Sequence, residues 1–237
     1  MSSQPNQSLI DGIRCFQELT TSDTPLGNKE LAERLDINVV RVNRLLRTLK
    51  SIGMAEQNAQ KKYMPGPAVH LLAAQSFHSS VLFRSATSVA IRTNYTDRTL
   101  AIGVLWKDMV VYMYHAKADQ SPAEGLGGYH IYHVSQSSIG QVLLADLDDE
   151  EIESRIAHWT EPQKAQIQSQ IKQIRADGYI LHQDDQQAVV NIASSFSIEG
   201  ATAGVAFTDF EVPFASHQEY VVQLNALIEE IKTNANC

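Results

Sequence analysis

The sequence predicts an α+β protein in two parts: a small helical N-terminal part with a β-hairpin, and a larger C-terminal part built around an antiparallel sheet. Three observations support this prediction. Apolar residues recur at helical spacing up to Leu49, whereas strand-like runs separated by turn residues begin at Thr99. Pro65 and Pro67, which tend to interrupt regular secondary structure, lie between these regions. The charge also divides there: residues 1–66 hold nine lysines and arginines against seven acidic residues, whereas residues 67–237 hold ten against twenty.

The N-terminal part is expected to begin with two helices. Residues 1–7 are polar and are expected to be disordered, and a first helix then spans about 8–20. Asn28 is the expected N-cap of a short second helix, which carries the apolar residues Leu31, Ala32 and Leu35. This second helix is expected to stop at residues 36–38, Asp-Ile-Asn.

A third helix and a hairpin are expected to follow. Val42, Leu45, Leu46 and Leu49 have the i, i+3, i+4, i+7 spacing of one buried helix face. Gly53 is expected to follow the helix as its C′ residue, where a left-handed backbone favours glycine. Residues 54–57 and 61–64, joined through 58–60, are expected to pair as a small hairpin.

The remaining chain is expected to form a linker helix and one α+β domain. A helix from residue 67 to about His78 connects the parts, and a domain boundary falls near it. The expected strands are 99–106, 109–115, 129–134, 179–183, 189–196 and 201–208, with a turn at Glu199-Gly200 between the last two. The expected helices are 138–158, 162–177 and a final amphipathic helix that carries Val221, Leu224, Leu227, Ile228 and Ile231.

Composition excludes several classes of protein. With 237 residues, 43% of them hydrophobic, the chain can bury a substantial core, so disorder of the whole chain is not expected. Its apolar runs are far shorter than the ~20 residues of a membrane span, and its polar start lacks the apolar region of a signal peptide. The two cysteines, Cys15 and Cys237, support neither a disulfide framework nor a cysteine-based metal site. We therefore expect a soluble cytoplasmic protein.

The third helix carries the pattern of a DNA-reading element. A net charge of −8 argues at first against a polyanionic partner, but the acidity lies in the C-terminal part. Arg41, Arg44 and Arg47 lie opposite the apolar face, and Lys61 and Lys62 lie on the hairpin. In helix-turn-helix proteins the start of the second helix of the motif meets base edges, while flanking Arg and Lys contact phosphates.

These features together predict a winged helix-turn-helix that binds double-stranded DNA. The alternative interpretation is that the three arginines only solubilise an exposed helix face. The candidate DNA-binding residues are Asn38, Val39, Val40, Arg41, Asn43, Arg44, Arg47, Lys61 and Lys62.

A first helix at Ser8 to Leu19 is followed by the helix-turn-helix residues 30–35 and 44–49 and by Gly53. In this order they resemble the IclR family of bacterial transcriptional regulators, in its first helix and in its helix-turn-helix pattern. Residues 63–66, Tyr-Met-Pro-Gly, resemble the end of the wing. The C-terminal matches follow in family order at residues 138–145 (Ser-Ile-Gly-Gln-Val-Leu-Leu-Ala), 178–179 (Gly-Tyr) and 191–193 (Asn-Ile-Ala). One departure concerns the third helix, where Val40-Arg41 replaces the family's usual Ser-Thr pair, so the operator preference need not follow the family's.

The local sequence around residues 136–140 also suggests a ligand site. A serine there can cap the helix that follows, while free backbone N–H groups favour a carboxylate or other anion. The alternative is an ordinary capped helix with no ligand. The resemblance implies a GAF-like effector domain whose pocket includes Tyr132, Ser137, Ser138, Ile139, Gly140, Asp184, Val189, Asn191, Ala206 and Thr208. Two departures affect the ligand's identity: Asn191 stands where many relatives carry Cys, and Gln186-Gln187 where acidic residues are usual.

Other motifs are assigned no chemistry. Asp184 and Asp185 are adjacent on a strand, so they face opposite sides and cannot act together on one bond. His130 and His133, three residues apart on one expected strand, would face opposite sides of it. His115 lies nearby, but no cysteine accompanies these histidines, so a metal site is not expected. Residues 125–128, Gly-Leu-Gly-Gly, lack the strand-to-helix context of a dinucleotide loop and are interpreted as a flexible turn beside the pocket.

The sequence therefore predicts a transcriptional regulator, not an enzyme, with no catalytic residue, metal or cofactor. Its expected parts are a DNA-binding domain at 1–66, a linker helix at 67–80 and an effector-binding domain at 81–237. Its expected partners are an operator duplex, a small-molecule effector such as an organic acid, and further copies of itself as a homodimer or a tetramer made of two dimers. The rivals are a small hydrolase, which lacks a nucleophile motif here, and a sensor whose helix-turn-helix binds protein.

Overall fold

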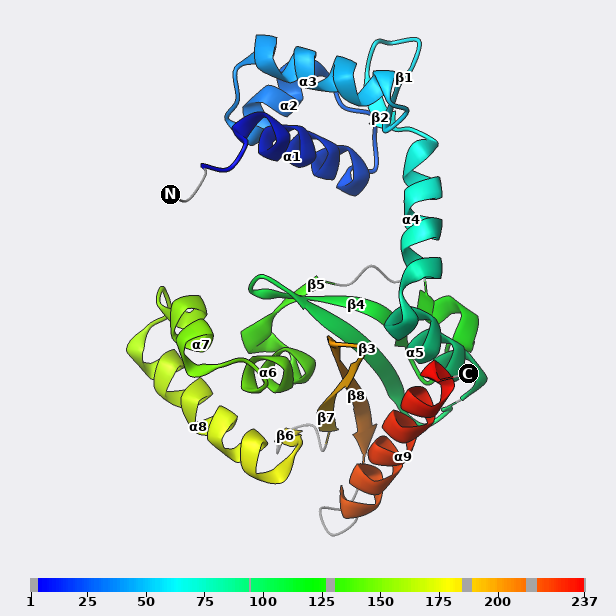
Figure 1. Ribbon diagram of the computed structural model, residues 1–237, viewed down its shortest axis with the longest axis vertical. Helices are drawn as coiled ribbons and strands as arrows, with labels where there is room; N and C mark the ends of the chain where they lie inside the picture. The colour runs from blue at the N-terminus through cyan, green and yellow to red at the C-terminus, as the bar shows by residue number, and fades with distance from the viewer. Residues whose placement is uncertain (1–3, 94, 127–130, 185–188, 212–216, 237) are drawn as a thin grey trace. The chain divides into compact units, whose positions relative to one another are not determined.

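The computed structural model describes residues 4–93, 95–126, 131–184, 189–211 and 217–236 (Figure 1). Its contacts divide the chain into two compact units, residues 1–79 and 80–237. The division falls at the end of the helix that we expected to link the two parts. We describe each unit by itself.

The N-terminal unit consists of helices and one small hairpin around a single core. Its elements are α1 (Gln7–Thr21), α2 (Asn28–Leu35), α3 (Val39–Ser51), β1 (Ala55–Gln57), β2 (Tyr63–Pro65) and α4 (Ala68–Ser79). The core contains the predicted apolar face of α3, and its buried members are Cys15, Leu19, Leu26, Leu31, Ala32, Leu35, Val42, Leu45, Leu46, Ala55 and Tyr63. Leu26 and Tyr63 exchange two backbone hydrogen bonds of 2.8 and 2.7 Å, which fasten the segment before α2 to the hairpin.

Two predicted helix starts in this unit are wrong. Asn6 and Gln7 were expected to be disordered, but the Asn6 side chain caps α1 by accepting the backbone N–H groups of Ser8 and Leu9 at 3.0 and 3.1 Å. Asn28 is not the N-cap of α2, because Gly27 takes that place and Asn28 is the first helical residue. The predicted end of α3 is confirmed, since Gly53 has a φ of +75°.

The C-terminal unit is an α+β domain, as predicted. Its helices are α5 (Val81–Arg92), η1 (Pro122–Leu126), η2 (Val134–Gln136), α6 (Ser138–Ala145), α7 (Asp149–Ile156), α8 (Glu161–Asp177) and α9 (His217–Ala235). Its strands are β3 (Thr99–Trp106), β4 (Met109–Ala116), β5 (Ile131–His133), β6 (Ile180–Asp184), β7 (Val189–Ile198) and β8 (Ala201–Glu211). They form a sheet in the order β5-β4-β3-β8-β7-β6, and each neighbouring pair is antiparallel.

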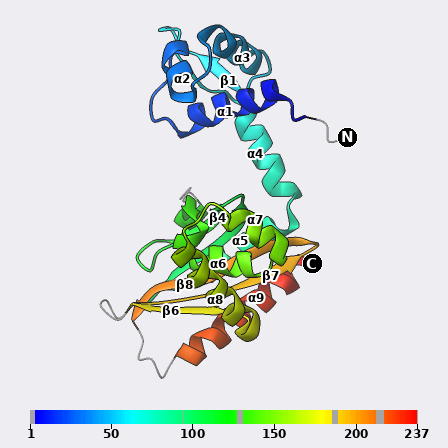
Figure 2. The ribbon, with the colours of Figure 1, turned by 90° about the vertical axis from the view of Figure 1, so that its left-hand side faces the viewer.

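Helices cover both faces of this sheet (Figures 1 and 2). α5 and α9 pack on one face around buried residues such as Val89, Phe207 and Leu224. α6 packs on the other face with α7 and α8 outside it, around residues such as Ile139, Ala206 and Ile171. Because side chains alternate between faces along a strand, His182 on β6 shares a face with Ile180, which packs on the α6 side.

Three further differences from the sequence expectations occur in this unit. The helix expected over 138–158 is two helices, because Asp148 starts α7 by accepting the backbone N–H of Glu151 at 2.7 Å. α5 was not predicted, since its serines, threonine and β-branched residues have weak helix propensity and only tertiary packing makes it a buried helix. The strand expected over 129–134 ends at His133 because Val134 begins η2, and residues 129 and 130 lie outside the described residues.

The turn predicted at Glu199-Gly200 is confirmed, with φ values of 50° and 81° that place both residues in the left-handed region. None of the described helices is both long enough and apolar enough to cross a membrane.

Candidate functional site

α3 presents one exposed stripe that combines apolar, amide and cationic side chains. The stripe consists of Val40, Asn43, Arg44 and Arg47, which follow the i, i+3, i+4, i+7 spacing of one helix face, and all four are exposed. We call it the α3 stripe. Val40 is 76% exposed and Val39, beside it, is 40% exposed. The opposite face of α3 is buried in the core, so the helix is fixed to its unit while the stripe faces outward.

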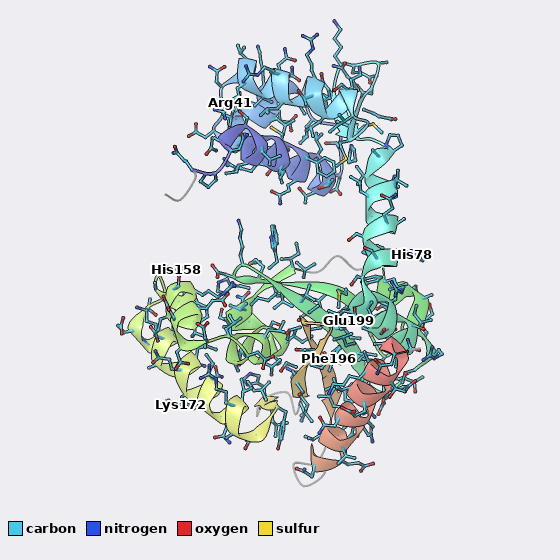
Figure 3. The ribbon with its side chains drawn as sticks, viewed as in Figure 1. Arg41, His78, His158, Lys172, Phe196 and Glu199 are labelled. Atoms are coloured by element: carbon cyan, nitrogen blue, oxygen red, sulfur yellow. The ribbon has the colours of Figure 1, made fainter. Side chains whose placement is uncertain are left out.

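Arg41, which was also predicted to bind DNA, forms an ion pair with a residue of its own unit. Labelled in Figure 3, it occupies the first turn of α3, and its Nη2 lies 2.7 Å from Oδ2 of Asp11 on α1. The Asp11 side chain is only 5% exposed, and its Oδ1 also accepts the side-chain amide of Gln7 at 2.8 Å. Nε of Arg41 is buried and has no hydrogen-bond partner in the described structure. The guanidinium of Arg41 is therefore committed to holding α3 against α1.

The hairpin of this unit presents two lysines on a rigid turn. We call β1, β2 and the turn between them the wing. Asn58 orders the turn, because its Oδ1 accepts the backbone N–H groups of Gln60 and Lys62 at 3.1 and 2.9 Å. Lys61 adopts a left-handed φ of 61°, and its carbonyl accepts the Gln57 side chain at 3.0 Å. Both Lys61 and Lys62 are exposed, and the hydrogen bonds that order the turn involve their backbone groups and not their charged ends.

In the C-terminal unit, the start of α6 is built as a capped helix end. Ser137 is the N-cap, and its buried Oγ accepts the backbone N–H of Gly140 at 3.1 Å. The same Oγ lies 2.9 Å from the hydroxyl of Tyr112 on β4. The N–H groups of Ser138 and Ile139 precede the first intrahelical bond of α6, so the helix supplies them no acceptor. Ser138 is partly exposed.

α6 lies very close to the sheet because of glycines. A Cβ on Gly204 would lie 2.6 Å from Cγ2 of Ile139, and a Cβ on Gly140 would lie 2.6 Å from the backbone of Val134. Ile139 is fully buried, and Ala206 is 1% exposed in the same packed layer. Of the predicted effector residues, Ile139, Gly140 and Ala206 thus form the junction between α6 and the sheet.

Polar residues that the sequence analysis did not select also meet on this side. Gln141, buried on α6, places its Oε1 3.0 Å from Nε2 of His182 on β6. Its amide donates to the carbonyl of Ser135 at 3.4 Å. Burial lowers the pKa of His182 and raises the pKa of Tyr112, so both groups are uncharged near neutral pH. A glutamine inside the apolar run 139–145 was the signal that could have identified Gln141.

The other predicted effector residues lie on strands of the sheet. His182 is the register partner of Asn191, and Asp184 is the partner of Val189, at the ends of β6 and β7. The side chains of Asp184 and Val189 lie outside what the structure describes. Thr208 pairs with Thr99 in register, and Tyr132 stands edge-on to Tyr112 with ring centroids 5.5 Å apart. Asp184, Val189, Asn191 and Thr208 therefore lie at nearby register positions on β6, β7 and β8, whereas Tyr132 lies on β5, at the other edge of the sheet.

A cavity of about 290 Å³ lies on the outer side of α6, toward α8. It is lined by Ser135, Gln136, Gln141, Trp159, Gln163, Gln166, Ile167 and Gln170. None of the predicted effector residues whose side chains the structure describes lines it, and Gln141 belongs both to its lining and to the polar group around His182.

The structure describes part of the motifs that were assigned no chemistry. The ring of His133 lies 2.8 Å from Oγ of Ser135 and packs against Trp159. Within the described residues, no group of three or more His, Cys, Asp or Glu side chains could hold a metal ion. The flexible turn predicted from residue 125 is wrong for Gly125, which is buried in η1 and packs on Tyr114, since a Cβ there would lie 2.7 Å from the ring. His130, Asp185, Gln186, Gln187 and residues 127–128 lie outside the described residues.

Comparisons with known proteins agree with this architecture. No family model matches the chain. It is 25% identical over 224 residues to the HTH-type transcriptional regulator KdgR of Dickeya chrysanthemi, covering 87% of this chain and 72% of that protein. An IclR transcriptional regulator from Alicyclobacillus acidocaldarius matches with a TM-score of 0.74 at 16% identity, covering 98% of this chain and 100% of that one.

An IclR homologue from Microbacterium hydrocarbonoxydans, complexed with 4-hydroxybenzoate, matches with a TM-score of 0.72 at 16% identity, over 97% of this chain and 99% of that one. These comparisons confirm the resemblance to the IclR family and the α+β fold class. The proteins named here are transcriptional regulators or a homologue of one, and none bears an enzyme's name.

Proposed function

We propose that this chain, which has the fold of the IclR family of transcriptional regulators, binds an operator duplex through α3 and the wing and is controlled by a small metabolite bound in its C-terminal unit. It works on DNA in the cytoplasm as a homodimer or a dimer of dimers. The observation that carries the proposal is the coincidence of the exposed α3 stripe with two exposed lysines on the wing.

The DNA-binding part of the proposal rests on how the cations are displayed. Arg44 and Arg47 project from the exposed face of α3, and Lys61 and Lys62 project from an ordered turn of the same unit. A helix with a basic outer face fits the major groove, and neighbouring cations neutralise phosphates and release counterions. The C-terminal unit holds most of the acidic residues, so the favourable charge for DNA lies on the N-terminal unit.

The effector-binding part rests on the start of α6. The N–H groups of Ser138 and Ile139 and the partly exposed Ser138 side chain form a donor set of the kind that binds carboxylates. A relative with this fold was crystallised with a carboxylic acid, 4-hydroxybenzoate. We propose an organic acid whose carboxylate meets these groups, with Tyr132, Asp184, Val189, Asn191 and Thr208 beside it.

The self-association part rests on α4. None of the side chains of α4, all of which the structure describes, is buried, and Leu71 and Leu72 are exposed. A second copy of the chain would cover these leucines and would present two α3 helices to the two halves of a palindromic site. Effector binding that favours one arrangement of the two copies by ~1–3 kcal/mol would change operator affinity about 5- to 150-fold.

The test is duplex binding measured by fluorescence anisotropy at two salt concentrations. Wild-type protein should bind with an affinity that falls as salt rises. Arg44→Ala should weaken operator binding, and Lys62→Ala should weaken binding to every duplex and reduce the salt slope by about one. Lys232→Ala, which removes an exposed cation from α9, is the matched control and should bind as wild type does. Unchanged affinity in an Arg44→Ala, Lys62→Ala double variant would reject this docking.

Ligand binding is tested by thermal shift with 4-hydroxybenzoate and with its neutral amide, 4-hydroxybenzamide. The proposal expects carboxylates of this size to raise the melting temperature more than their amides do, because a ligand that binds only the folded state stabilises it. If neither this acid nor a wider panel of small carboxylates stabilises the C-terminal unit, the proposed effector class is wrong.

A further inference from the structure

The first turn of α3 exposes an apolar side chain where a DNA-reading helix meets base edges. Val40 is 76% exposed and Val39 is 40% exposed, although burial of valine is usually favourable. The N-terminal residues of such a helix contact bases in the major groove. An exposed valine at this place therefore needs an explanation in terms of what it meets.

The polar residues on both sides of Val40 are already engaged within the protein. Oδ1 of Asn38 accepts the backbone N–H of Val40 at 2.8 Å, which caps the helix. The guanidinium of Arg41 lies 2.7 Å from the buried carboxylate of Asp11. Val40 is thus the more exposed of the two valines in this turn, and Asn38 and Arg41 hold the turn in place.

The side chains further along the α3 stripe supply the attraction to DNA. Asn43, Arg44 and Arg47 lie on the same helix face as Val40, so a duplex bound by these residues also meets Val40. In the major groove, the apolar group among the base edges is the C5-methyl of thymine, and valine can contact it without leaving a donor or acceptor unpaired.

We propose that Val40 reads the C5-methyl group of a thymine in each half-site, and that Arg41 acts as a positioning residue that fixes this turn through Asp11 and contacts no phosphate. The inference rests on the proposed DNA binding. It goes beyond it by assigning the base chemistry read at the first turn of α3 and by removing Arg41 from the DNA contacts.

The first experiment replaces thymine by deoxyuridine in an operator obtained by in vitro selection with the full-length protein. Only the methyl group is lost at each position. Replacing the contacted thymine in one half-site only should weaken wild-type binding about fourfold, the effect expected for burial of one methyl group. Val40→Ala should bind the thymine and deoxyuridine operators equally, whereas Arg44→Ala should bind both more weakly but keep the fourfold ratio.

The second experiment separates a positioning role of Arg41 from a phosphate contact. Arg41→Met should leave the salt slope of binding unchanged, whereas Lys62→Ala should reduce it by about one. The double variant Asp11→Asn, Arg41→Met removes both charges and should recover affinity lost in Arg41→Met, which a phosphate contact would not allow.

The possible outcomes separate the assignment of thymine to Val40 from the proposed DNA binding itself. Selection of no operator and absence of duplex binding by wild type would overturn the proposed function and this inference together. An operator with no deoxyuridine effect, or with an effect that persists in Val40→Ala, would overturn the thymine assignment while DNA binding stands. A reduced salt slope in Arg41→Met would show that Arg41 contacts a phosphate.

Discussion

Removing the guanidinium of Arg41 should destabilise the N-terminal unit specifically. In Arg41→Met the buried carboxylate of Asp11 would keep only the Gln7 amide as a side-chain partner. Breaking a fully buried ion pair costs about 3–5 kcal/mol, but the Arg41 side chain is 35% exposed and water can reach the site. We therefore expect a loss of about 1–3 kcal/mol, in the range found for unsatisfied buried polar groups.

The distribution of tryptophan makes the assay specific. The chain has two tryptophans, Trp106 and Trp159, and both lie in the C-terminal unit. In urea titrations, tryptophan fluorescence should report the same C-terminal transition for wild type and Arg41→Met. Far-ultraviolet circular dichroism follows both units, and its N-terminal component should move to lower urea concentration in the variant.

A double-mutant cycle supplies the control. In Asp11→Asn, Arg41→Met, neither partner leaves an uncompensated charge, so the double variant should be more stable than the sum of the single effects implies, by ~1–2 kcal/mol. Additive effects, or a fluorescence transition that moves with the circular dichroism, would refute the assignment of this pair to the junction between α1 and α3.

Three further predictions concern the C-terminal unit. Ser138→Trp should abolish effector binding, measured by calorimetry, while operator affinity, measured by anisotropy on the same preparation, persists. An effector affinity equal to that of the wild type would show that the effector binds at another site. Gly204→Val should destabilise this unit by about 1–3 kcal/mol, because the added side-chain atoms would collide with Ile139. Tryptophan fluorescence in urea measures this loss, and an unchanged unfolding midpoint would contradict the close packing of α6 against the sheet. Burial lowers the pKa of His182, so the imidazole binds a proton more tightly in the unfolded chain than in the folded one. The stability of the folded state should therefore be fully present above the unfolded pKa of about 6.5 and should be lost as the pH falls through the folded pKa. His182→Gln should lessen this loss in urea titrations at several pH values, and an identical pH profile would contradict it.

The effector site shows where sequence reasoning reached its limit. A serine cap was recognisable because Ser137 and Ser138 precede an apolar helical run, and the structure identifies Ser137 as the cap. The contact of its hydroxyl with Tyr112, twenty-five residues away, and the pairing of Gln141 with His182 depend on how the sheet meets α6. Nothing in the local pattern around these residues encodes those distances.

Arg41 shows the same limit in the N-terminal unit. Helical spacing put it on the outer side of α3 with Arg44 and Arg47, which is a statement about direction around one helix axis. Whether a long side chain on the border of that face turns toward solvent or toward a neighbouring helix depends on the charge that the neighbour offers. Asp11 is that charge, and it belongs to a helix thirty residues earlier.

The sequence by itself determined the helix-turn-helix and hairpin of the N-terminal unit, the buried face of α3, the place of Gly53 after α3, the turn at Glu199-Gly200, and the antiparallel α+β class, because each depends on periodicity or on the backbone preferences of one or two residues. Tertiary structure decided that residues 81–92 form a buried helix, that 138–158 is two helices, and that Arg41 serves Asp11 while Val40 stays exposed. These outcomes depend on contacts between segments far apart in the chain, whose energies exceed the local propensities of a few tenths of a kcal/mol per residue.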